Sequence, residues 1–523
     1  MASVPRPGRP PDPEEWRGRR VAVVGLGISN LALVRFLRRH GAAVEVRDQQ
    51  SPEALGGRLR EAMEWGAAAR VGEGYLEGLD AFDAVFLTPG MRKDLPEIAA
   101  LHAKGVPVSS EVGLFMRYCR APIVGVTGSA GKTTTTTLTG RLFAAAHPRT
   151  YVGGNIGRPL VELVEDIPPD AWVVLELSSF QLELVESSPN LAAVLNLRPN
   201  HLDVHPSMDA YRAAKQRIYR FQGPGDWCVF NADDDATWPW HAEAPGRVAA
   251  FSTAQPVECG TWLAGPRAEA VVLTNLLPVR AAAEGAPLPG GTRELLRAAD
   301  IRLPGAHNRA NVLAAVSLAV LGGVPDAAVA PVVREFHGVP HRLETVAEVG
   351  GVLFVNDSIA TSPDRSIAAL ETFERPVVLI AGGYDKGLDF REWAEVVRRR
   401  ARAVVLVGKA AGKLAEALEA AAGRAAGGTA VGGAAAAGEG AGAAQAASGG
   451  AGGGPFVERA ATFEEAVWRA AAAARPGDIV LLSPACASYD MFRNFEERGA
   501  AFREIVRRWA ARAAGAADAT GRA

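Results

Sequence analysis

The feature that most constrains this chain is a glycine-rich turn that joins an apolar strand to a helix, within the run APIVGVTGSAGKTTTTTL of residues 121–138. Glycines let the backbone curl until its N–H groups point at phosphate oxygens, and the N-terminus of the following helix adds partial positive charge. Lys132 can reach the β- and γ-phosphates of a nucleotide, and Thr133 can place its hydroxyl on Mg²⁺. Val126 stands where the standard pattern has glycine, so this is a shortened phosphate loop. The alternative is an ordinary glycine turn with a solvent-facing lysine.

Strands and helices alternate along the chain, which is typical of parallel sheets with helices on their faces. The length of 523 residues suffices for three or four domains. Short runs rich in valine and leucine predict strands in each part of the chain, among them residues 21–27, 43–48, 83–90, 172–177 and 192–197. The fold class is therefore predicted to be α/β.

We predict three α/β units after a disordered N-terminal tail. The tail covers residues 1–16, and the units cover residues 17–112, 113–339 and 340–523. An almost pure Ala/Gly stretch at residues 420–455 has too little bulky apolar surface to offset the entropy of ordering. We expect a flexible insertion there, with a helix in its Ala-rich pieces as the alternative.

Composition excludes several classes of protein. Lys and Arg number 56 against 58 Asp and Glu, so neither nucleic acid nor an anionic membrane is expected as the main partner. The four cysteines form no CxxC pair, which gives no zinc site or disulfide framework and fits a reducing cytoplasm. No strongly apolar stretch of about 18 residues predicts a membrane span, and the N-terminus lacks the apolar segment of a signal peptide. We expect a cytoplasmic monomer.

A second glycine turn follows the first predicted strand. Gly25 and Gly27 begin a GxGxxG pattern, but Asn30 stands in place of the third glycine. Asp48 closes the next strand at about the separation expected of a ribose-binding acid. This turn could be a simple tight turn, a nicotinamide-dinucleotide site, or a site for the diphosphate of another nucleotide. Gly90, at the end of a further strand, could line the same crevice.

A few polar residues near the phosphate loop are candidate metal ligands. Glu176 ends a predicted strand, where a carboxylate could hold Mg²⁺, although a surface glutamate is an equal alternative. By themselves, His201 and His205 are ordinary polar loop residues and Lys215 is a solvated helix lysine. Arg342 and Asp357 could form a simple ion pair.

Ten motifs in order give a far more specific signal than any one of them. They are TGSAGKTT, GGNIG, ELSSFQLE, NHLDVH, YRAAKQRIY, GAHNRANVLAA, PHRLE, NDSIATSP, GGYDKGLDF and LLSPACASYDMFRNFEERG. On these motifs the chain resembles the Mur ligases, the ATP-dependent amide-forming enzymes of peptidoglycan assembly. The last motif is most characteristic of the member that adds glutamate.

The resemblance implies a fold and a reaction. The fold would be an N-terminal Rossmann-like parallel sheet, a central ATPase-type domain with the phosphate loop, and a C-terminal Rossmann-like domain. The reaction would add D-glutamate to UDP-N-acetylmuramoyl-L-alanine through an acyl phosphate, with ATP as co-substrate. Domain closure would bring the ATP and glutamate sites together.

The resemblance also implies roles for particular residues. UDP-substrate binding would involve Gly27, Ile28, Ser29, Asp48, Gln49, Gly90 and Asn155. ATP binding would involve Gly128, Ser129, Ala130, Gly131, Lys132, Thr133, Thr134, Asn311, Arg342 and Asp357. Glutamate binding would involve Thr361, Lys386, Ser488, Tyr489 and Phe495. Two Mg²⁺ ions would be held by Thr133, Glu176, His201 and a carbamylated Lys215, and the catalytic residues would be Lys132, His201 and Lys215.

Three alternatives stay open. Ile359, Tyr384 and Asp385 depart from the common pattern near the proposed glutamate end, which leaves L-glutamate or another amino acid of a sister ligase possible. The turn of the first unit could indicate a nicotinamide-dependent oxidoreductase. The chain could also be a non-catalytic nucleotide-binding module.

Overall fold

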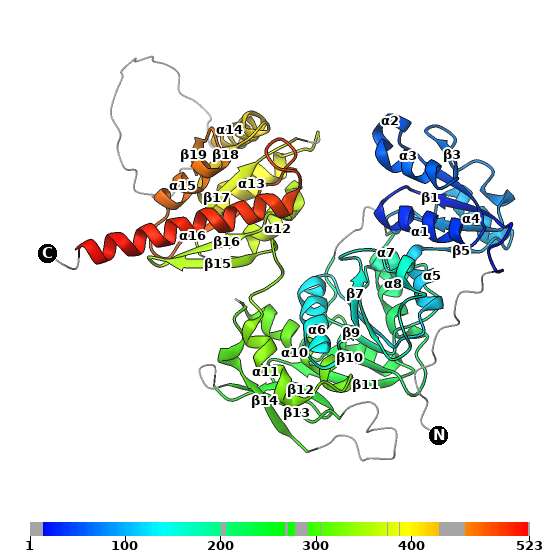
Figure 1. The fold of residues 1–523 in the computed structure, drawn as a ribbon. Helices are drawn as coiled ribbons and strands as arrows, with labels where there is room; N and C mark the ends of the chain where they lie inside the picture. The colour runs from blue at the N-terminus through cyan, green and yellow to red at the C-terminus, as the bar shows by residue number, and fades with distance from the viewer. Residues whose placement is uncertain are drawn as a thin grey trace. The chain divides into compact units, whose positions relative to one another are not determined.

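The computed structural model describes residues 14–199, 205–266, 270–277, 291–303, 305–373, 375–385, 387–427 and 455–520. The chain divides into two compact units, Met1–Phe336 and His337–Ala523 (Figure 1). The first unit holds two sheets and the second unit holds one. The described residues include no helix that is long and apolar enough to cross a membrane.

The N-terminal sheet has five parallel strands in the order β3-β2-β1-β4-β5. Its central strand β1 is almost entirely buried, as expected of a parallel strand covered on both faces. The strands are β1 (Arg20–Val24), β2 (Ala43–Asp48), β3 (Ala68–Val71), β4 (Ala84–Leu87) and β5 (Val108–Ser109). The helices are α1 (Ile28–Arg39), α2 (Pro52–Leu55), α3 (Gly57–Glu64) and α4 (Pro96–Ala103).

The middle sheet has nine strands in the order β14-β13-β12-β11-β10-β9-β6-β8-β7. The strands are β6 (Ile123–Thr127), β7 (Thr150–Gly154), β8 (Trp172–Glu176), β9 (Leu191–Val194), β10 (Trp227–Asn231), β11 (Arg247–Ser252), β12 (Gly260–Ala264), β13 (Val271–Thr274) and β14 (Arg293–Arg297). The last three strands pair antiparallel and extend the parallel sheet. The helices are α5 (Glu111–Tyr118), α6 (Lys132–Ala146), α7 (Ser179–Leu182), α8 (Met208–Arg220), α10 (Ala306–Leu321) and α11 (Asp326–Glu335).

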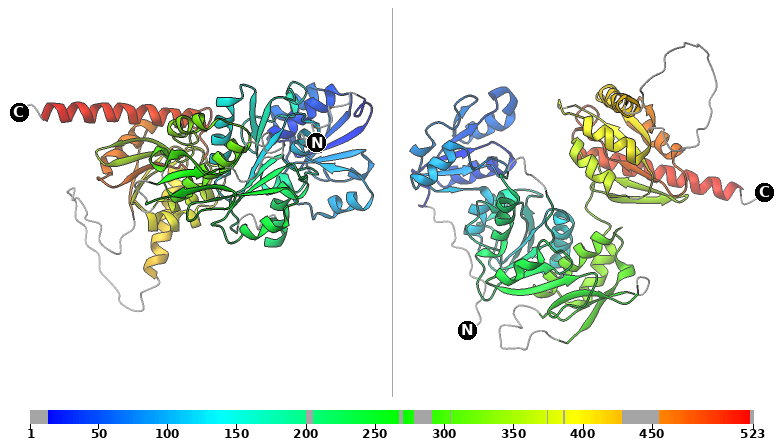
Figure 2. Two further views of the ribbon diagram at one scale, coloured as in Figure 1. Left: turned by 90° about the horizontal axis from the view of Figure 1, so that it is seen from below. Right: turned by 180° about the vertical axis from the view of Figure 1, so that it is seen from behind.

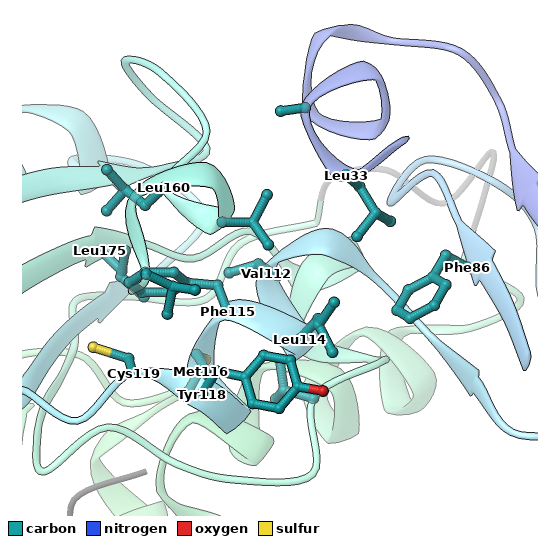
Figure 3. Close-up of a cluster of buried hydrophobic side chains, with 14 of the residues drawn as sticks. Leu33, Phe86, Val112, Leu114, Phe115, Met116, Tyr118, Cys119, Leu160 and Leu175 are labelled. Carbon is teal, nitrogen blue, oxygen red and sulfur yellow. The ribbon is translucent and has the colours of Figure 1, made fainter. Parts of the chain in front are cut away.

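Helix α5 joins the two sheets of the first unit through a shared core. Phe115 lies in one buried cluster with Leu33 and Phe86 of the N-terminal sheet domain and with Leu160 and Leu175 of the middle domain (Figure 3). Each large apolar side chain buried there contributes about 1.5–3 kcal/mol to stability. This core packs the two sheet domains against each other. The boundary expected near residue 112 falls within α5.

Trp16, the last residue of the predicted N-terminal tail, belongs to the core. Trp16 is buried, and its indole Nε1 donates a hydrogen bond to the hydroxyl of Tyr118 at 2.8 Å. Its ring also lies 5.7 Å from that of Phe86. The prediction that the tail reaches residue 16 is therefore wrong for Trp16, because this side chain completes the core around α5.

The second unit has a six-stranded sheet in the order β15-β16-β20-β17-β18-β19, parallel except for β15. The strands are β15 (Glu344–Val349), β16 (Val352–Asn356), β17 (Val377–Gly382), β18 (Ala401–Val407), β19 (Phe456–Arg459) and β20 (Ile479–Leu482). The helices are α12 (Pro363–Glu371), α13 (Arg391–Arg400), α14 (Ala411–Gly427), α15 (Phe463–Ala473) and α16 (Phe495–Thr520).

Side chains of β18 alternate between the two faces of this sheet, as the pleat requires. Val404 and Leu406 lie in one core with α12, α13 and α14, whereas Val405 lies in another with α15 and α16. Figure 2 shows α16 as the long red helix along its face. Within the predicted insertion, residues 420–427 belong to α14, and residues 428–454 lie outside the described residues.

Candidate active site

The phosphate loop lies between β6 and α6, at the carboxyl end of a buried strand. Gly131 is the N-cap of α6 and has φ +83°. A Cβ at this position would lie 2.2 Å from Oδ1 of Asn311, so glycine is required both by the backbone and by the side chain from α10. Ala130 N donates to Oδ1 of Asn196 at 2.9 Å, which fixes the loop against the end of β9. Asn311, predicted to bind nucleotide, is thus in contact with the loop.

Two lysines meet at one carbonyl of this loop. Lys132 Nζ donates to the oxygen of Gly128 at 2.9 Å and to that of Ser129 at 3.2 Å. Lys215 Nζ, from α8, donates to the same Gly128 oxygen at 2.9 Å. The alternative of a solvated Lys215 is therefore wrong, because the side chain is only 1% exposed. Burial, and then the charge of Lys132, hold the pKa of Lys215 well below its ordinary value.

Glu176 ends β8 beside the loop and is buried. Its Oε1 accepts a hydrogen bond from Asn155 Nδ2 at 2.8 Å. Its Oε2 is buried and has no hydrogen-bond partner within the described part of the chain. A buried carboxylate oxygen with nothing to bond is costly unless a cation takes it, so its chemistry fits a hard divalent ion.

The other predicted metal ligands are only partly described. Thr133 is buried in the first turn of α6. His201 lies outside the described residues. Within the described ranges, no three or more His, Cys, Asp or Glu side chains form a group that could hold a metal ion.

A cleft of about 350 Å³ opens between the N-terminal and middle sheet domains. It brings together four residues predicted to bind the UDP substrate, namely Ile28, Ser29, Gly90 and Asn155. Its wall also includes residues that we did not predict: Ser178, Phe180 and Gln181. All three belong to the motif ELSSFQLE, so the motif contained a signal for them.

The turn after β1 is held by side chains rather than by glycine alone. Asn30 Nδ2 donates to the carbonyls of Val24 at 3.0 Å and Gly25 at 2.7 Å. Asp48 accepts from Leu26 N at 2.7 Å and uses its other oxygen for the backbone of the turn after β2. Asn30 thus fills the place of the third glycine, which argues against a nicotinamide-dinucleotide site. Gly27 is the N-cap of α1, and Gln49 is exposed.

In the second unit, Asp357 is buried at the end of β16. Its carboxylate accepts from Leu343 N at 3.2 Å and from Ser483 Oγ at 2.9 Å. Burial raises the pKa of Asp357 to about 7, although both hydrogen bonds and the charge of Arg342 oppose this rise. Arg342 is exposed two residues before β15.

Of the residues predicted to bind glutamate, Thr361 lies on the loop between β16 and α12, and Ser488 and Tyr489 lie on the loop between β20 and α16. Ser488 is buried, whereas Tyr489 is 66% exposed. Thr361 precedes α12 and Phe495 begins α16. Lys386 lies outside the described residues. Asp385 pairs with Lys413 at 2.8 Å, which lowers the pKa of Asp385 and secures this turn.

Arg498 of α16 was not predicted from the sequence, and it joins the β16–α12 loop to the β20–α16 loop. Its guanidinium is fully buried and donates to both Oγ and the carbonyl of Ser358, at 3.0 and 2.9 Å. It also donates to the carbonyls of Cys486 at 3.1 Å and Ala487 at 3.3 Å. The arginine of the motif FEERG was the available signal.

Three family models match this chain in order. They describe a MurD-like N-terminal domain of Mur ligases at residues 19–110, a Mur ligase middle domain at residues 126–319 and a glutamate ligase domain at residues 341–486. The chain is 48% identical to UDP-N-acetylmuramoylalanine–D-glutamate ligase of Symbiobacterium thermophilum, over 93% of this chain and 97% of the relative. It is 41% identical to the ligase of the same name from Pelotomaculum thermopropionicum, over 94% and 98%. A solved UDP-N-acetylmuramate-alanine ligase from Thermotoga maritima is 19% identical over 94% of this chain and 99% of that chain, with a TM-score of 0.48. The chain belongs to the Mur ligase family.

Proposed function

We propose that this chain is an ATP-dependent ligase that joins D-glutamate to UDP-N-acetylmuramoyl-L-alanine and releases ADP and phosphate. Relatives that carry this activity in their names match nearly the full length of the chain. The observation that carries the proposal is the convergence of Lys132 and Lys215 on the Gly128 carbonyl, near a Glu176 oxygen that has no hydrogen-bond partner among the described residues. This arrangement suits a triphosphate and a cation.

The chemical task is to join a carboxylate to an amine in water. A carboxylate oxygen is a poor leaving group, so the substrate carboxylate first attacks the γ-phosphorus of ATP, the bond to the β-phosphate oxygen breaks, and ADP leaves. The glutamate amine then attacks the acyl carbon, the C–O bond to phosphate breaks, and the amine loses a proton. Lys132 stabilises the negative charge that develops on the phosphoryl oxygens during the first step.

Glu176 is the residue whose environment most clearly fits Mg²⁺. Two ions would be held by Thr133, Glu176, His201 and carbamylated Lys215. When bound, these ions would neutralise charge on the phosphate oxygens. Carbamylation forms a bond between the neutral Lys215 amine and the carbon of CO₂ and releases one proton. The lowered pKa of Lys215 supports this step, because only the neutral amine is nucleophilic.

The substrate contacts follow from the same assignment. The UDP substrate is assigned to the cleft through Gly27, Ile28, Ser29, Asp48, Gln49, Gly90 and Asn155. ATP is assigned to the phosphate loop, residues 128–134, with Asn311, Arg342 and Asp357. The incoming glutamate is assigned to Thr361, Lys386, Ser488, Tyr489 and Phe495. We also propose that the enzyme acts as a monomer in the cytoplasm; its four free cysteines agree with a reducing compartment.

A phosphate-release panel tests the proposal. Enzyme, ATP and UDP-N-acetylmuramoyl-L-alanine are incubated in turn with D-glutamate, L-glutamate, diaminopimelate and lysine. Of the four amino acids, we expect only D-glutamate to cause phosphate release. The Lys132→Ala variant should release phosphate about 100-fold or more slowly than wild type. Full turnover of that variant would refute the phosphate-loop assignment, and release with another amino acid would assign a sister ligase.

A further inference from the structure

The first unit contains a partly buried ionic link between its two sheet domains, beside the cleft, that the mechanism above does not use. Lys93, three residues after Gly90, pairs through Nζ with Glu183 Oε2 at 2.9 Å. The same nitrogen donates to the carbonyl of Pro89 at 2.5 Å. Lys93 belongs to the N-terminal sheet domain, whereas Glu183 follows α7 in the middle domain. The link therefore ties the loop on one side of the cleft to the wall on the other.

Glu183 continues this link on the middle domain. Its Oε1 lies 3.1 Å from Nδ1 of His205, in an alignment too poor for a good hydrogen bond but close enough for attraction. His205 is fully buried, and its Nε2 lies 2.9 Å from the hydroxyl of Ser179. Burial lowers the pKa of His205, so the ring is neutral near pH 7. The tautomer that carries its proton on Nδ1 would direct that proton toward Glu183 and leave Nε2 to accept from the Ser179 hydroxyl.

Both ends of the link reach Phe180, which lines the cleft. The His205 ring stacks on Phe180 with centroids 4.9 Å apart and an interplanar angle of 8°. Lys93 Nζ lies 5.7 Å from the centroid of the same ring. Pro89, which accepts the hydrogen bond from Lys93, also lines the cleft. Glu183 thus connects Lys93, which holds the Pro89 loop, to His205, whose ring stacks on Phe180.

The positive charge of Lys93 and the negative charge of Glu183 compensate each other. Burial lowers the pKa of Lys93, and the neighbouring Glu183 opposes that effect. Lys93 is 18% exposed and Glu183 is 24% exposed, so water screens the pair only partly. Removal of either charge leaves the other poorly compensated in a mostly dry place.

We propose that Lys93, Glu183 and His205 form a cleft clamp, in which Glu183 is a positioning residue for the UDP-linked substrate. The clamp holds the Pro89–Gly90 loop and the Phe180 ring at the separation that the substrate requires. This inference rests on the proposed function. Loss of the clamp should weaken binding of the UDP-linked substrate and leave ATP binding unchanged.

The test uses full-length Glu183→Gln, Lys93→Met and the double variant. We expect each single variant to raise KM for the UDP substrate about tenfold, with kcat and KM for ATP within about twofold of wild type. The double variant should be no worse than the worse single variant, because it leaves no unpaired charge. The matched control is Lys104→Met, which removes an exposed partner of Asp80 in the same sheet domain and should change nothing.

Two outcomes would overturn the clamp while the wild-type enzyme is active. Unchanged KM values in an active enzyme would show that the link does not position the substrate. Equal rises in both KM values together with a lower melting temperature would show a purely structural role. An inactive wild-type enzyme would instead refute the proposed function, and the clamp with it.

Discussion

Replacement of Gly154 by alanine tests whether the close approach of β7 to β8 holds Glu176 in place. Gly154 has φ +89°, and a Cβ there would lie 2.2 Å from the carbonyl oxygen of Glu176 and 3.1 Å from its carbonyl carbon and amide nitrogen. These atoms are backbone and cannot rotate away. The end of β7 must therefore move by about 1 Å to restore van der Waals contact.

The cost of this substitution can be estimated in parts. An alanine in the left-handed region costs about 1–2 kcal/mol, and the overpacking costs about 1–3 kcal/mol. The movement also weakens the 2.8 Å hydrogen bond from Asn155 N to the Glu176 carbonyl, worth about 1 kcal/mol. We expect a loss of about 3–6 kcal/mol in the free energy of unfolding of the first unit.

The substitution should also reduce turnover, because Asn155 Nδ2 holds Oε1 of Glu176. A displacement of about 1 Å at a reacting centre can cost about 100-fold in rate. Urea unfolding and phosphate release measure the two effects. The control is Gly105→Ala: Gly105 has φ +71°, and a Cβ there would meet no other atom within 4 Å. This substitution should cost only the strain of the left-handed backbone, about 1–2 kcal/mol. If Gly154→Ala matched this control in stability and kept full turnover, the reasoning would be wrong.

Three further changes test other parts of the structure. Burial raises the pKa of Glu111 to about 7, so the stability that its protonated form provides is lost as pH rises through 7. At pH 8, Glu111→Gln should raise the free energy of unfolding by at most about 3 kcal/mol. At pH 4 the same substitution should give no gain, and urea titrations at the two pH values measure the difference. Removal of CO₂ should lower turnover about 100-fold or more and bicarbonate should restore it, with a carbamate signal from labelled bicarbonate in NMR spectra that Lys215→Met lacks. Arg498→Met should lower the free energy of unfolding of the second unit by about 3–5 kcal/mol in urea titrations and raise KM for glutamate. Arg498→Lys keeps the charge and should lose less stability.

The parallel strands were predictable because strands buried on both faces are continuous apolar runs. The run at residues 172–177 becomes β8, with Glu176 at its carboxyl end as predicted. Parallel strands bring their carboxyl ends to one edge of the sheet, so the phosphate loop and Glu176 could be placed together from the sequence. The antiparallel β12–β14 extension was not predicted, since its strands are only partly buried.

The environment of single polar side chains could not be predicted. Lys215 and Gly128 are 87 positions apart in the chain, and nothing in the local pattern of α8 shows that its lysine reaches the phosphate loop. Arg498 lies in a charged segment that resembles a solvated helix start, yet it is fully buried. Trp16 stands in a stretch rich in proline and charge, and its place in the core depends on residues as distant as Tyr118, 102 positions away.

The two lysines of the phosphate loop raise an electrostatic problem that carbamylation would solve. Lys132 and Lys215 donate to the same Gly128 carbonyl, so two ammonium groups there would repel each other in a poorly hydrated place. Glu176 attracts Lys215 but does not offset its burial. A neutral Lys215 removes the repulsion. Its carbamate would carry a negative charge near the Glu176 oxygen that no described residue bonds. Lys132 would then be the cation that faces the phosphates, with two anionic groups beside it for Mg²⁺. On this argument, a permanent charge at position 215, as in Lys215→Arg, should impair turnover as severely as Lys215→Met, and bicarbonate should rescue neither variant.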